Sequence, residues 1–439
     1  MAPIAVTPLS PPSPTLDNTS KLTKAGAETI LSKTISNGSP AVADLDASKL
    51  IFTRNLSPKN VVAPNSPEVW SQNYTSDHML TVRWTEQSGW EAPEIRPYGP
   101  LSLMPTASVF HYATECFEGM KAYRGFDGKV RLFRPERNAR RFLQSATRIA
   151  LPGFPPEEFL KLLKKFVGVE APKWVSEPGQ FIYLRPTMIA TAPAIGIQRP
   201  REALLYVMMV MMPSLGDPSA VPPSVTASAG TGSGQAPEAK RLAAAGMRLL
   251  ASRHDMIRAW PGGFGSAKVG ANYGPTLVAQ GEARARGYDQ ILWLFGDECF
   301  VTEAGGSNFF VLWKTAQGRT ELITAPLGDG VILEGVTRAS VLDLVRRTRP
   351  DVDVVERKFT MHEIVQAADQ GRLIEAFGAG TAFFISPCSD IHFRGVDVSL
   401  PLAKGVTADF ARAIRQALKD IMYGSQQHEW GVVVEEEKI

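Results

Sequence analysis

The chain has 439 residues, of which 44% are hydrophobic and 21% charged, a globular composition with room for two domains of ordinary size. Its formal net charge of +3 is small for this length and gives no basis for binding nucleic acid or an anionic membrane surface. The 3 cysteines and 6 histidines are scattered, which argues against a disulfide framework, predicts no metal site and fits a reducing compartment. The longest apolar run, Ala203–Pro213, is too short to span a bilayer.

The N-terminal segment Met1–Ser48 is rich in Pro, Ser, Thr and Ala and has no apolar period, so residues 1–50 are predicted to be a disordered extension. It lacks the basic start and the long apolar core of a secretory signal. A mitochondrial presequence is the alternative, since three lysines fit a weak amphipathic helix: Lys21, Lys24 and Lys33. Acidic residues are interspersed and no arginine precedes Arg54, so we expect a cytoplasmic protein.

Residues 51–213 are predicted to form a small α/β domain with a mainly antiparallel sheet. Strand patterns occur at His78–Trp84, Phe117–Arg124, Val130–Phe133, Phe181–Ala190 and Ala203–Pro213. Asp127-Gly128 is a hairpin turn pair. Two helices are expected behind an opening proline, at Pro135–Ala150 and Pro156–Val169.

Residues 214–238, rich in Pro and Gly, are predicted to be an interdomain linker before a larger domain at 239–439. Helices are expected there at Ala239–Arg253, Tyr273–Arg286, Val336–Arg347, Met361–Gln370 and Val406–Tyr423. Strands are expected at Gln290–Leu294, Phe309–Trp313, Leu322–Thr324, Leu373–Ala376 and Thr381–Ser386. The fold class is therefore a two-domain α+β or α/β protein.

The stretch Ala259–Pro275, AWPGGFGSAKVGANYGP, holds a single lysine, Lys268, between glycines, with Tyr273 five places on. Glycines can adopt positive φ, and because they have no side chain another molecule or chain segment can come close to their backbone. A lysine in such surroundings can become a nucleophilic amine, as a Schiff-base lysine must. An ordinary lysine in a glycine-rich surface turn is the alternative.

Three further features follow in the same half of the chain. Glu303 is a lone carboxylate beside an apolar strand and needs a cationic partner, such as a protonated pyridine nitrogen. Gly335 leads into a helix beginning near Val336 and Thr337, whose free N–H groups suit a phosphate. The turn Phe377–Ala382, FGAGTA, is a candidate second anion cradle. A solvated turn, an ordinary helix start and a tight strand turn are the alternatives.

The first domain adds basic residues. One of the arginines at the first expected helix can face a phosphate: Arg134, Arg137, Arg140 or Arg141. Tyr183 and Arg185 alternate on one side of a strand, where an arginine can grip a carboxylate bidentately or form a structural ion pair. A Schiff-base lysine, a lone carboxylate and a phosphate site together fit a pyridoxal-phosphate enzyme.

These stretches, in this order, resemble the branched-chain amino acid aminotransferases, which are fold-type IV pyridoxal-phosphate enzymes with the D-amino acid aminotransferase-like architecture. The matching motifs include FHYATECFEGMKAYRG (Phe110–Gly125), VRLFRPERNARRF (Val130–Phe142), YLRP (Tyr183–Pro186), RAWPGGFGSAKVGANYGPT (Arg258–Thr276), VTEAGGSNFF (Val301–Phe310), GVILEGVTRAS (Gly330–Ser340) and FGAGTA. The likeness runs from about Trp70 to Trp430.

The resemblance implies a role for each matching residue. Lys268 would be the catalytic residue, forming the Schiff base and moving the α-proton, while Glu303 would pair with the pyridine nitrogen and Tyr273 with the phenolic oxygen. The phosphate would be held by Arg141, Val336, Thr337 and Thr381, with Arg258 close by. The substrate α-carboxylate would meet Tyr112, Thr381 and Ala382. The side-chain pocket would be walled by Phe117, Tyr183 and an aromatic near Trp70 or Tyr74, with Arg185 taking the second carboxylate of glutamate.

It also implies an activity and an assembly. The enzyme would transfer the amino group of leucine, isoleucine or valine to 2-oxoglutarate with ping-pong kinetics, in synthesis or breakdown of these amino acids, and would use pyridoxal 5'-phosphate. Ile197 would reach toward a neighbouring subunit, so a homodimer is expected. A D-amino acid aminotransferase or aminodeoxychorismate lyase reaction, and a protein of this fold without chemistry, are the alternatives.

Several departures from the family pattern bear on specificity. Phe383 and Ser386 stand where mammalian members carry a redox CxxC, so we expect no such thiol switch. Gly306 replaces a threonine that often lines the pocket, which predicts a wider pocket. Thr337 replaces a valine and adds a hydroxyl beside the phosphate.

Overall fold

The computed structural model describes residues 42–213, 246–382 and 384–437. The chain divides into two units, Met1–Ala43 and Asp44–Ile439, and every element below belongs to the second. The predictions for residues 1–41, for the whole predicted linker 214–238 and for Phe383 fall outside the described residues. Ordered structure begins before residue 51, because Leu45 is buried and a 3-10 helix, η1, spans Ala47–Lys49.

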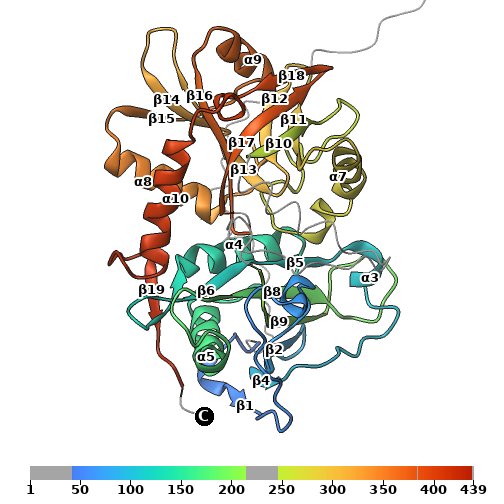
Figure 1. Ribbon diagram of the computed structural model, residues 1–439. Coiled ribbons are helices and arrows are strands. Elements are labelled where there is room, and N and C mark those ends of the chain that lie inside the picture. The colour runs from blue at the N-terminus through green and yellow to red at the C-terminus, as the bar shows by residue number, and fades with distance from the viewer. Residues whose placement is uncertain (1–41, 214–245, 383, 438–439) are drawn as a thin grey trace, which may run out of the picture. The chain divides into compact units, whose positions relative to one another are not determined.

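The first sheet has ten strands in the order β1-β4-β2-β9-β8-β6-β7-β19, with β3 paired to β2 and β5 to β8 (Figure 1). Their bounds are β1 Ile51–Phe52, β2 His78–Thr85, β3 Gly89–Trp90, β4 Glu94–Pro97, β5 Glu115–Phe117, β6 Met120–Arg124, β7 Val130–Phe133, β8 Phe181–Ala190, β9 Glu202–Val210 and β19 Gly431–Val434. All described pairs in it are antiparallel except β1–β4, as the sequence predicts.

Four helices accompany this sheet: α2 Pro67–Trp70, α3 Val109–Tyr112, α4 Pro135–Arg148 and α5 Pro156–Trp174. Each of the two long ones begins with proline at its first turn, where a missing N–H costs nothing. The apolar face of α4, with Ala139, Phe142 and Ala146, shares one core with Phe159 and Phe166 of α5. Figure 1 places α4 and β5 on the side of the sheet that faces the second sheet.

The second sheet has nine strands in the order β12-β11-β10-β17-β16-β13-β14-β15, with β18 paired to β17. Their bounds are β10 Met247–Ala251, β11 Gln290–Phe295, β12 Phe300–Ala304, β13 Ser307–Lys314, β14 Thr320–Thr324, β15 Val352–Glu356, β16 Leu373–Gly380, β17 Phe384–Phe393 and β18 Val396–Ser399. Around it lie α7 Thr276–Ala285, α8 Val336–Thr348, α9 Met361–Asp369 and α10 Asp409–Met422, with 3-10 helices η2 Gly270–Asn272 and η3 Pro401–Lys404. The two-domain α+β class is confirmed.

Three predictions about elements were wrong in whole or part. The described part of the expected helix Ala239–Arg253 contains strand β10, which lies between two parallel neighbours and has Leu249 buried. A strand buried on both faces has a continuous apolar run, which periodicity does not distinguish from a helix. The expected strand Phe117–Arg124 is broken at Gly119, where a Cβ would lie 2.1 Å from the hydroxyl of Tyr183.

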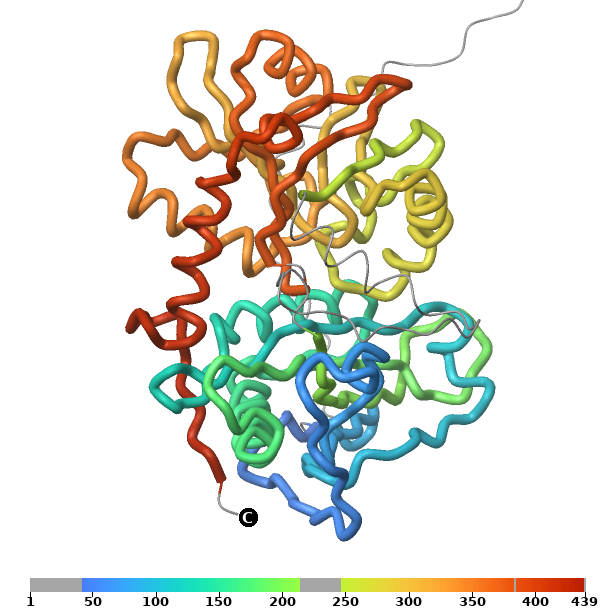
Figure 2. The backbone as a smooth tube through the Cα atoms, viewed as in Figure 1, coloured from blue at the N-terminus to red at the C-terminus, as the bar shows by residue number. Residues whose placement is uncertain are grey.

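The third difference concerns the C-terminus. Strand β19 pairs with β7 in the first sheet, although the sequence pattern assigns the whole of 239–439 to the second domain. Figure 2 shows this last stretch descending beside α5 after α10. Arg134 at the start of α4 joins the two parts, since its guanidinium lies 4.2 Å from the Trp430 ring centroid and 2.9 Å from Asp343 of α8.

Among the described helices, none combines the length and apolar character needed to cross a membrane.

Candidate active site

The loop that carries Lys268 is fixed between the two sheets by its backbone. The Lys268 N–H donates to Ser145 Oγ of α4 at 2.8 Å, and its carbonyl accepts from the Phe117 N–H at 3.0 Å. The Asn272 amide donates to the Ala267 carbonyl at 2.8 Å and so holds the loop from within. The position of Lys268 is thus set by hydrogen bonds to both its N–H and its carbonyl.

Glycines are needed in this loop mainly because neighbouring atoms come close to its backbone, and less because of unusual dihedral angles. A Cβ at Gly265 would lie 2.1 Å from the Val331 carbonyl oxygen, and one at Gly270 would lie 1.9 Å from Glu115 Oε1. Of the loop's glycines only Gly262 has a positive φ, 81°. Any side chain at Gly265 or Gly270 would push the Lys268 loop away from its supports.

The amine of Lys268 points at two aromatic rings. Its Nζ donates to the Tyr273 hydroxyl at 3.0 Å and lies 4.8 Å from the centroid of the Phe117 ring. The Phe117 and Tyr273 rings are themselves 5.1 Å apart. This arrangement brings Lys268 and Tyr273 together, with the Phe117 ring beside the amine.

Glu303 lies on β12 and is buried, 4% exposed. The Asn308 amide donates to its Oε1 at 3.0 Å, the Leu333 N–H donates to the same oxygen at 3.3 Å, and Arg258 forms an ion pair with Oε2. Burial raises the pKa of Glu303, and the charge of Arg258 opposes that shift. The carboxylate has a cationic partner, as predicted, and in this structure the partner is Arg258.

Arg141 on α4 forms a buried bidentate pair with Glu118. Its Nε lies 2.7 Å from Glu118 Oε1 and one terminal nitrogen lies 2.8 Å from Oε2, while Asn138 donates to Oε2 at 2.8 Å. The other terminal nitrogen of Arg141 donates to the Glu334 carbonyl at 2.9 Å, just before α8. The structure therefore brings Arg141 to the helix start that Val336 and Thr337 open.

The segment Val331–Gly335 is a hub that connects these groups. Its backbone binds Arg258 through the Val331 carbonyl at 3.2 Å, Glu303 through the Leu333 N–H, and Asn308 through the Leu333 carbonyl at 2.9 Å. Gly335 caps α8 without a side-chain hydrogen bond. A helix start so arranged, beside Arg141 and Arg258, suits a phosphate group.

The side of the site lined by the first sheet holds Phe117, Tyr183 and Arg185. The Arg185 guanidinium lies 4.7 Å from the Phe117 ring centroid and donates to the Tyr183 hydroxyl at 3.0 Å. Its Nε is buried and has no hydrogen-bond partner among the described residues. A buried, unpaired N–H on an arginine is a place for a carboxylate.

Other predicted site residues lie elsewhere. Tyr112 ends α3 at an exposed surface, with its hydroxyl on the Ile195 carbonyl, and Ile197 nearby in the chain is 91% exposed. Tyr74 packs edge-on against Trp174 of α5 and donates to the Asn60 carbonyl at 2.7 Å, so it belongs to the first core. Hydrogen bonds of the described residues thus do not join either tyrosine to Lys268.

Thr381 and Ala382 form the turn between β16 and β17. Gly380 beside them approaches Ser307 so closely that a Cβ there would lie 2.7 Å from Ser307 Oγ. The turn therefore abuts the β12–β13 turn that follows Glu303, which agrees with a shared site. Residues that sequence reasoning missed are Ser145, Glu118, Asn308 and Ser307. The last three lie inside the matching motifs, whereas Ser145 follows the motif that ends at Phe142 and had no signal.

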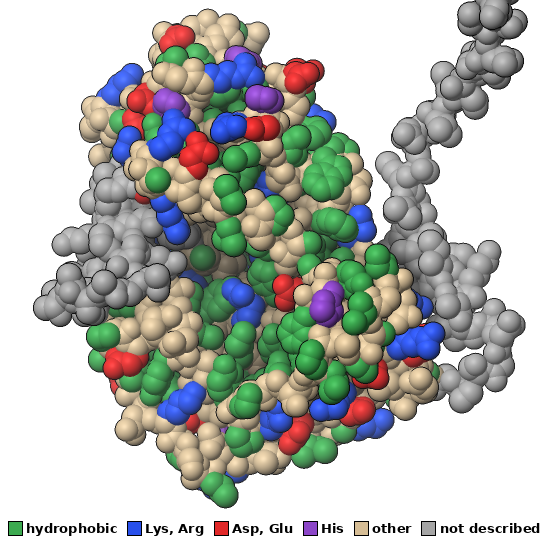
Figure 3. Space-filling view, turned by 90° about the vertical axis from the view of Figure 1, so that its right-hand side faces the viewer, with side chains coloured by type: hydrophobic (Ala, Val, Ile, Leu, Met, Phe, Trp, Pro, Cys, Tyr) green, Lys and Arg blue, Asp and Glu red, His purple; other side chains and the backbone are tan. Residues whose placement is uncertain are grey.

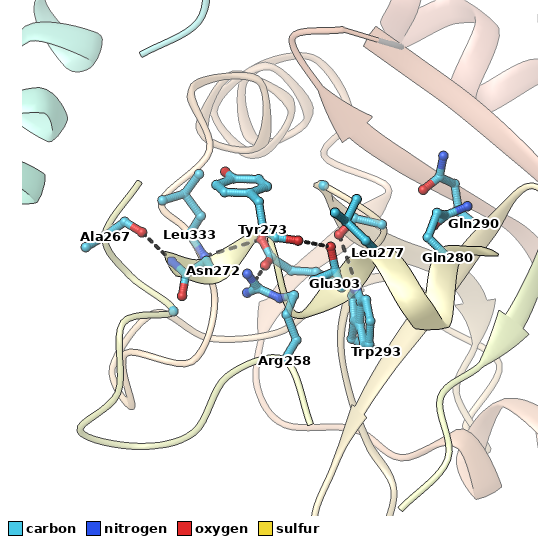
Figure 4. Close-up of a pocket in the computed structure, with 14 residues that line it drawn as sticks. Arg258, Ala267, Asn272, Tyr273, Leu277, Gln280, Gln290, Trp293, Glu303 and Leu333 are labelled. Atoms are coloured by element: carbon cyan, nitrogen blue, oxygen red, sulfur yellow. Dashed lines mark hydrogen bonds and ion pairs between the residues drawn. The ribbon is translucent and has the colours of Figure 1, made fainter. Parts of the chain in front are cut away.

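A cavity of about 150 Å³ lies against Glu303 (Figure 4). Arg258 and Glu303 meet within it, and Gln280 and Gln290 lie beside each other at one end, near Trp293. Gly306 borders it, and a Cβ at Gly306 would meet nothing within 4 Å. The space beside Gly306 is therefore open, and the wider substrate pocket stays a prediction.

Residues 115–391 match the family model of class IV amino-transferases. The branched-chain-amino-acid aminotransferases of Saccharomyces cerevisiae are similar: the mitochondrial one is 43% identical over 89% of this chain and 93% of its own, the cytosolic one 42% over 90% and 98%. A crystal structure of the branched-chain amino acid aminotransferase from Thermobaculum terrenum, in its PLP-form, aligns with TM-score 0.59, 22% identity and coverage of 82% and 99%. The chain belongs to the branched-chain-amino-acid aminotransferases, within the class IV amino-transferases.

Proposed function

We propose that this protein is a pyridoxal-phosphate-dependent transaminase that exchanges the amino group between branched-chain L-amino acids and 2-oxoglutarate. The observation that carries this proposal is the convergence of three groups on one site: the Lys268 amine held by Tyr273, the buried carboxylate Glu303, and Arg141 at the start of α8. Family membership and the similar solved structure support it.

The residues present fit the cofactor. Arg258 has a buried Nε without a hydrogen-bond partner among the described residues, and the start of α8 has no side-chain cap, so both can receive phosphate oxygens. The residues that would hold the cofactor are Lys268, Tyr273, Glu303, Arg141, Arg258, Val336, Thr337 and Thr381. Bound there, pyridoxal phosphate supplies an electron-withdrawing ring that stabilises negative charge at the substrate α-carbon.

The chain's own groups handle the proton. Lys268 Nζ takes the α-proton and returns it, since this amine projects into the site beside the Phe117 ring and no other described side chain of the loop carries a basic nitrogen there. The Tyr273 hydroxyl orients that amine from 3.0 Å. Burial raises the pKa of Glu303, so its carboxylate is stabilised by a nearby cation and would favour the protonated form of the cofactor's ring nitrogen.

Arg185 allows the same site to accept both an apolar and an acidic substrate side chain. An apolar side chain lies against Phe117 and Tyr183 while the Arg185 guanidinium stays stacked on the rings. A substrate with a second carboxylate recruits the unpaired Nε of Arg185 and forms a charge-assisted pair. Thr381 and Ala382 receive the α-carboxylate common to both substrates.

The assembly we propose is a homodimer. Exposed apolar residues of α3, of the loop after β8 and of α7 support it: Phe110, Tyr112, Ile195, Ile197, Leu277 and Val278. Figure 3 views the molecule from the side of α3 and α7 and shows hydrophobic side chains gathered on this face. An apolar surface of this kind is costly in a monomer. In the dimer, Tyr112 and Ile197 complete the substrate pocket of the partner, which accounts for their exposure in one chain.

The compartment we propose is the cytoplasm, on the basis of the acidic residues among the first 48 and the lack of arginine there. Relatives include both a mitochondrial and a cytosolic enzyme. A fluorescent fusion of the full chain, compared with one that begins at Lys49, tests this. Mitochondrial signal from the full fusion alone would contradict it.

A substrate panel tests the activity. The purified holoenzyme receives L-leucine, L-isoleucine, L-valine, D-alanine or L-glutamate with a matched 2-oxo acid, and product formation is followed. We expect turnover with the branched L-amino acids and glutamate, and Arg185→Met should raise KM for glutamate far more than for leucine. Turnover with D-alanine in place of the branched L-amino acids would overturn the proposal.

A further inference from the structure

One face of α4 carries four polar residues at helical spacing: Asn138, Arg141, Ser145 and Arg148. The apolar residues of the same helix lie in the first core together with α5. Residues three or four positions apart on a helix share one side, so these four form a single polar stripe. Hydrogen bonds join the polar stripe to segments of the chain that are far apart in sequence.

The N-terminal half of the polar stripe holds the groups around the proposed phosphate site. Asn138 and Arg141 both bond the buried carboxylate of Glu118, and Arg141 also donates to the Glu334 carbonyl at 2.9 Å. The first turns of α4 are thereby fixed to the segment that leads into α8. A helix rises by a constant step of about 1.5 Å per residue, so a side chain one turn further along α4 has a defined place relative to that phosphate site.

Ser145, one turn beyond Arg141, bonds the backbone of Lys268. Ser145 is 0% exposed, and its Oγ accepts from the Lys268 N–H at 2.8 Å. No other acceptor among the described residues takes this N–H. A backbone N–H that loses its acceptor is unfavourable, so the hydroxyl of Ser145 keeps the Lys268 backbone against α4.

Arg148, the last residue of α4, bonds the start of the same loop. One terminal nitrogen donates to the Gly262 carbonyl at 3.2 Å and to the Gly263 carbonyl at 3.3 Å, and the guanidinium lies 4.6 Å from the Phe264 ring centroid. The backbone turns tightly here, because Gly262 has φ 81° and a Cβ at Gly263 would lie 2.9 Å from the Trp260 ring. Arg148 therefore binds the turn through which the chain enters the Lys268 loop.

One helix thus bonds the phosphate side of the site and two points of the lysine loop. We propose that Ser145 and Arg148 are positioning residues: through them α4 fixes the Lys268 loop relative to Arg141, and so fixes the amine relative to a phosphate bound there. The effect on catalysis rests on the proposed function, whereas the attachment of the loop to α4 does not.

Amide hydrogen exchange of the full-length protein tests the attachment. Ser145→Ala should speed exchange at Lys268 roughly 2- to 12-fold, the effect of losing one hydrogen bond, and Arg148→Met should do the same at residues 260–264. Ser76→Ala is the matched control, because Ser76 is also 0% exposed and its hydroxyl donates to the His78 carbonyl at 3.1 Å, in the first sheet. It should leave exchange in the Lys268 loop unchanged.

Steady-state kinetics of the holoenzyme test the catalytic part. Ser145→Ala and Arg148→Met should each lower kcat for L-leucine roughly 2- to 12-fold with little change in KM, and Arg148→Lys, which keeps a cationic donor, should recover part of the loss. Unchanged exchange in the loop would overturn the proposal, as would a rise in KM at constant kcat or an equal loss in Ser76→Ala. Faster exchange in a protein whose wild type shows no transaminase activity would refute the proposed function and still support the attachment of the loop to α4.

Discussion

The Tyr273 hydroxyl lies 3.0 Å from Lys268 Nζ, and the two residues belong to the same loop, five positions apart. The loop's backbone is fixed by Ser145 and Phe117, so the tyrosine holds the amine from a rigid support. This contact sets where the base stands relative to a substrate α-proton.

Tyr273→Phe should therefore lower kcat while the protein stays folded. Losing one hydrogen bond costs about 0.5–1.5 kcal/mol, which corresponds to a roughly 2- to 12-fold slower step. Stopped-flow absorbance of a single half-reaction measures it. Tyr288→Phe is the control, since Tyr288 bonds Asp397 at 3.3 Å, away from Lys268, and an equal effect of both variants would contradict the assigned role.

Variants of the Arg141–Glu118 pair distinguish the contribution of Arg141 to stability from its contribution to cofactor binding. Arg141→Met leaves a fully buried carboxylate without its cation and should destabilise the apoenzyme by about 3–5 kcal/mol in urea unfolding. Adding Glu118→Gln removes that charge but keeps an acceptor for Asn138, so most of the stability should return.

Cofactor affinity should behave differently from stability in these variants. Both the single and the double variant lack the guanidinium that faces the start of α8, so the Kd for pyridoxal phosphate should stay raised roughly 10- to 100-fold. Fluorescence titration of the apoenzyme measures this. A double variant that binds the cofactor as tightly as the wild type would remove Arg141 from the phosphate site.

Adding one methyl group at Gly335 should disturb Glu303 indirectly, through Asn308. A Cβ there would lie 2.1 Å from Asn308 Oδ1, and the Asn308 amide holds both Glu303 and the Leu333 carbonyl. Gly335→Ala should cost about 1–3 kcal/mol of stability and speed cofactor loss during dialysis. Gly328→Ala, where a Cβ meets nothing within 4 Å, is the matched control. Equal cofactor retention in the two variants would show that Asn308 does not position Glu303.

Lys121 predicts a pH-dependent stability. Its pKa is lowered from 10.5 to about 8 in the folded protein, so the unfolded chain binds more protons between these values and stability rises with pH there. Lys121→Met removes the cost of the buried charge, which Arg415 and Lys419 increase. The variant's Tm should exceed the wild type's at neutral pH, and the difference should shrink toward pH 10.5.

Lys164→Met, on the exposed face of α5, provides the reference for that comparison. Its Tm should follow the wild type across the whole pH range, since the substitution changes a solvated surface. If the Lys121→Met advantage stayed constant with pH, its origin would be packing and not charge.

The sequence predicts those parts of the site that lie within one short stretch. Lys268 and Tyr273 share a loop, and Val336 and Thr337 follow a glycine that the helix start requires, so local patterns identify them. Glu118 and Arg141 are 23 residues apart, and Glu303 and Leu333 are 30 apart. Such pairs form only when the sheets assemble, so periodicity carries no signal of them.

The fold shows the same division. Helices with an opening proline and an amphipathic face were predicted within a few residues, as α4 shows. Strand β10 was missed because burial on both sides removes alternation, and β19 because its partner β7 lies far earlier in the chain. Tyr112 was placed with the substrate from motif likeness, and a single chain leaves it on an exposed surface.

The central claim is that Lys268 holds the cofactor, and reductive trapping tests it most directly. The purified yellow holoenzyme is treated with borohydride, digested, and the modified lysine is located by mass spectrometry, with Lys268→Ala as the control. The account predicts a pyridoxyl adduct on Lys268 of the wild type and none at that position in the variant. An adduct on another lysine, such as Lys121, or a protein without any adduct, would contradict it.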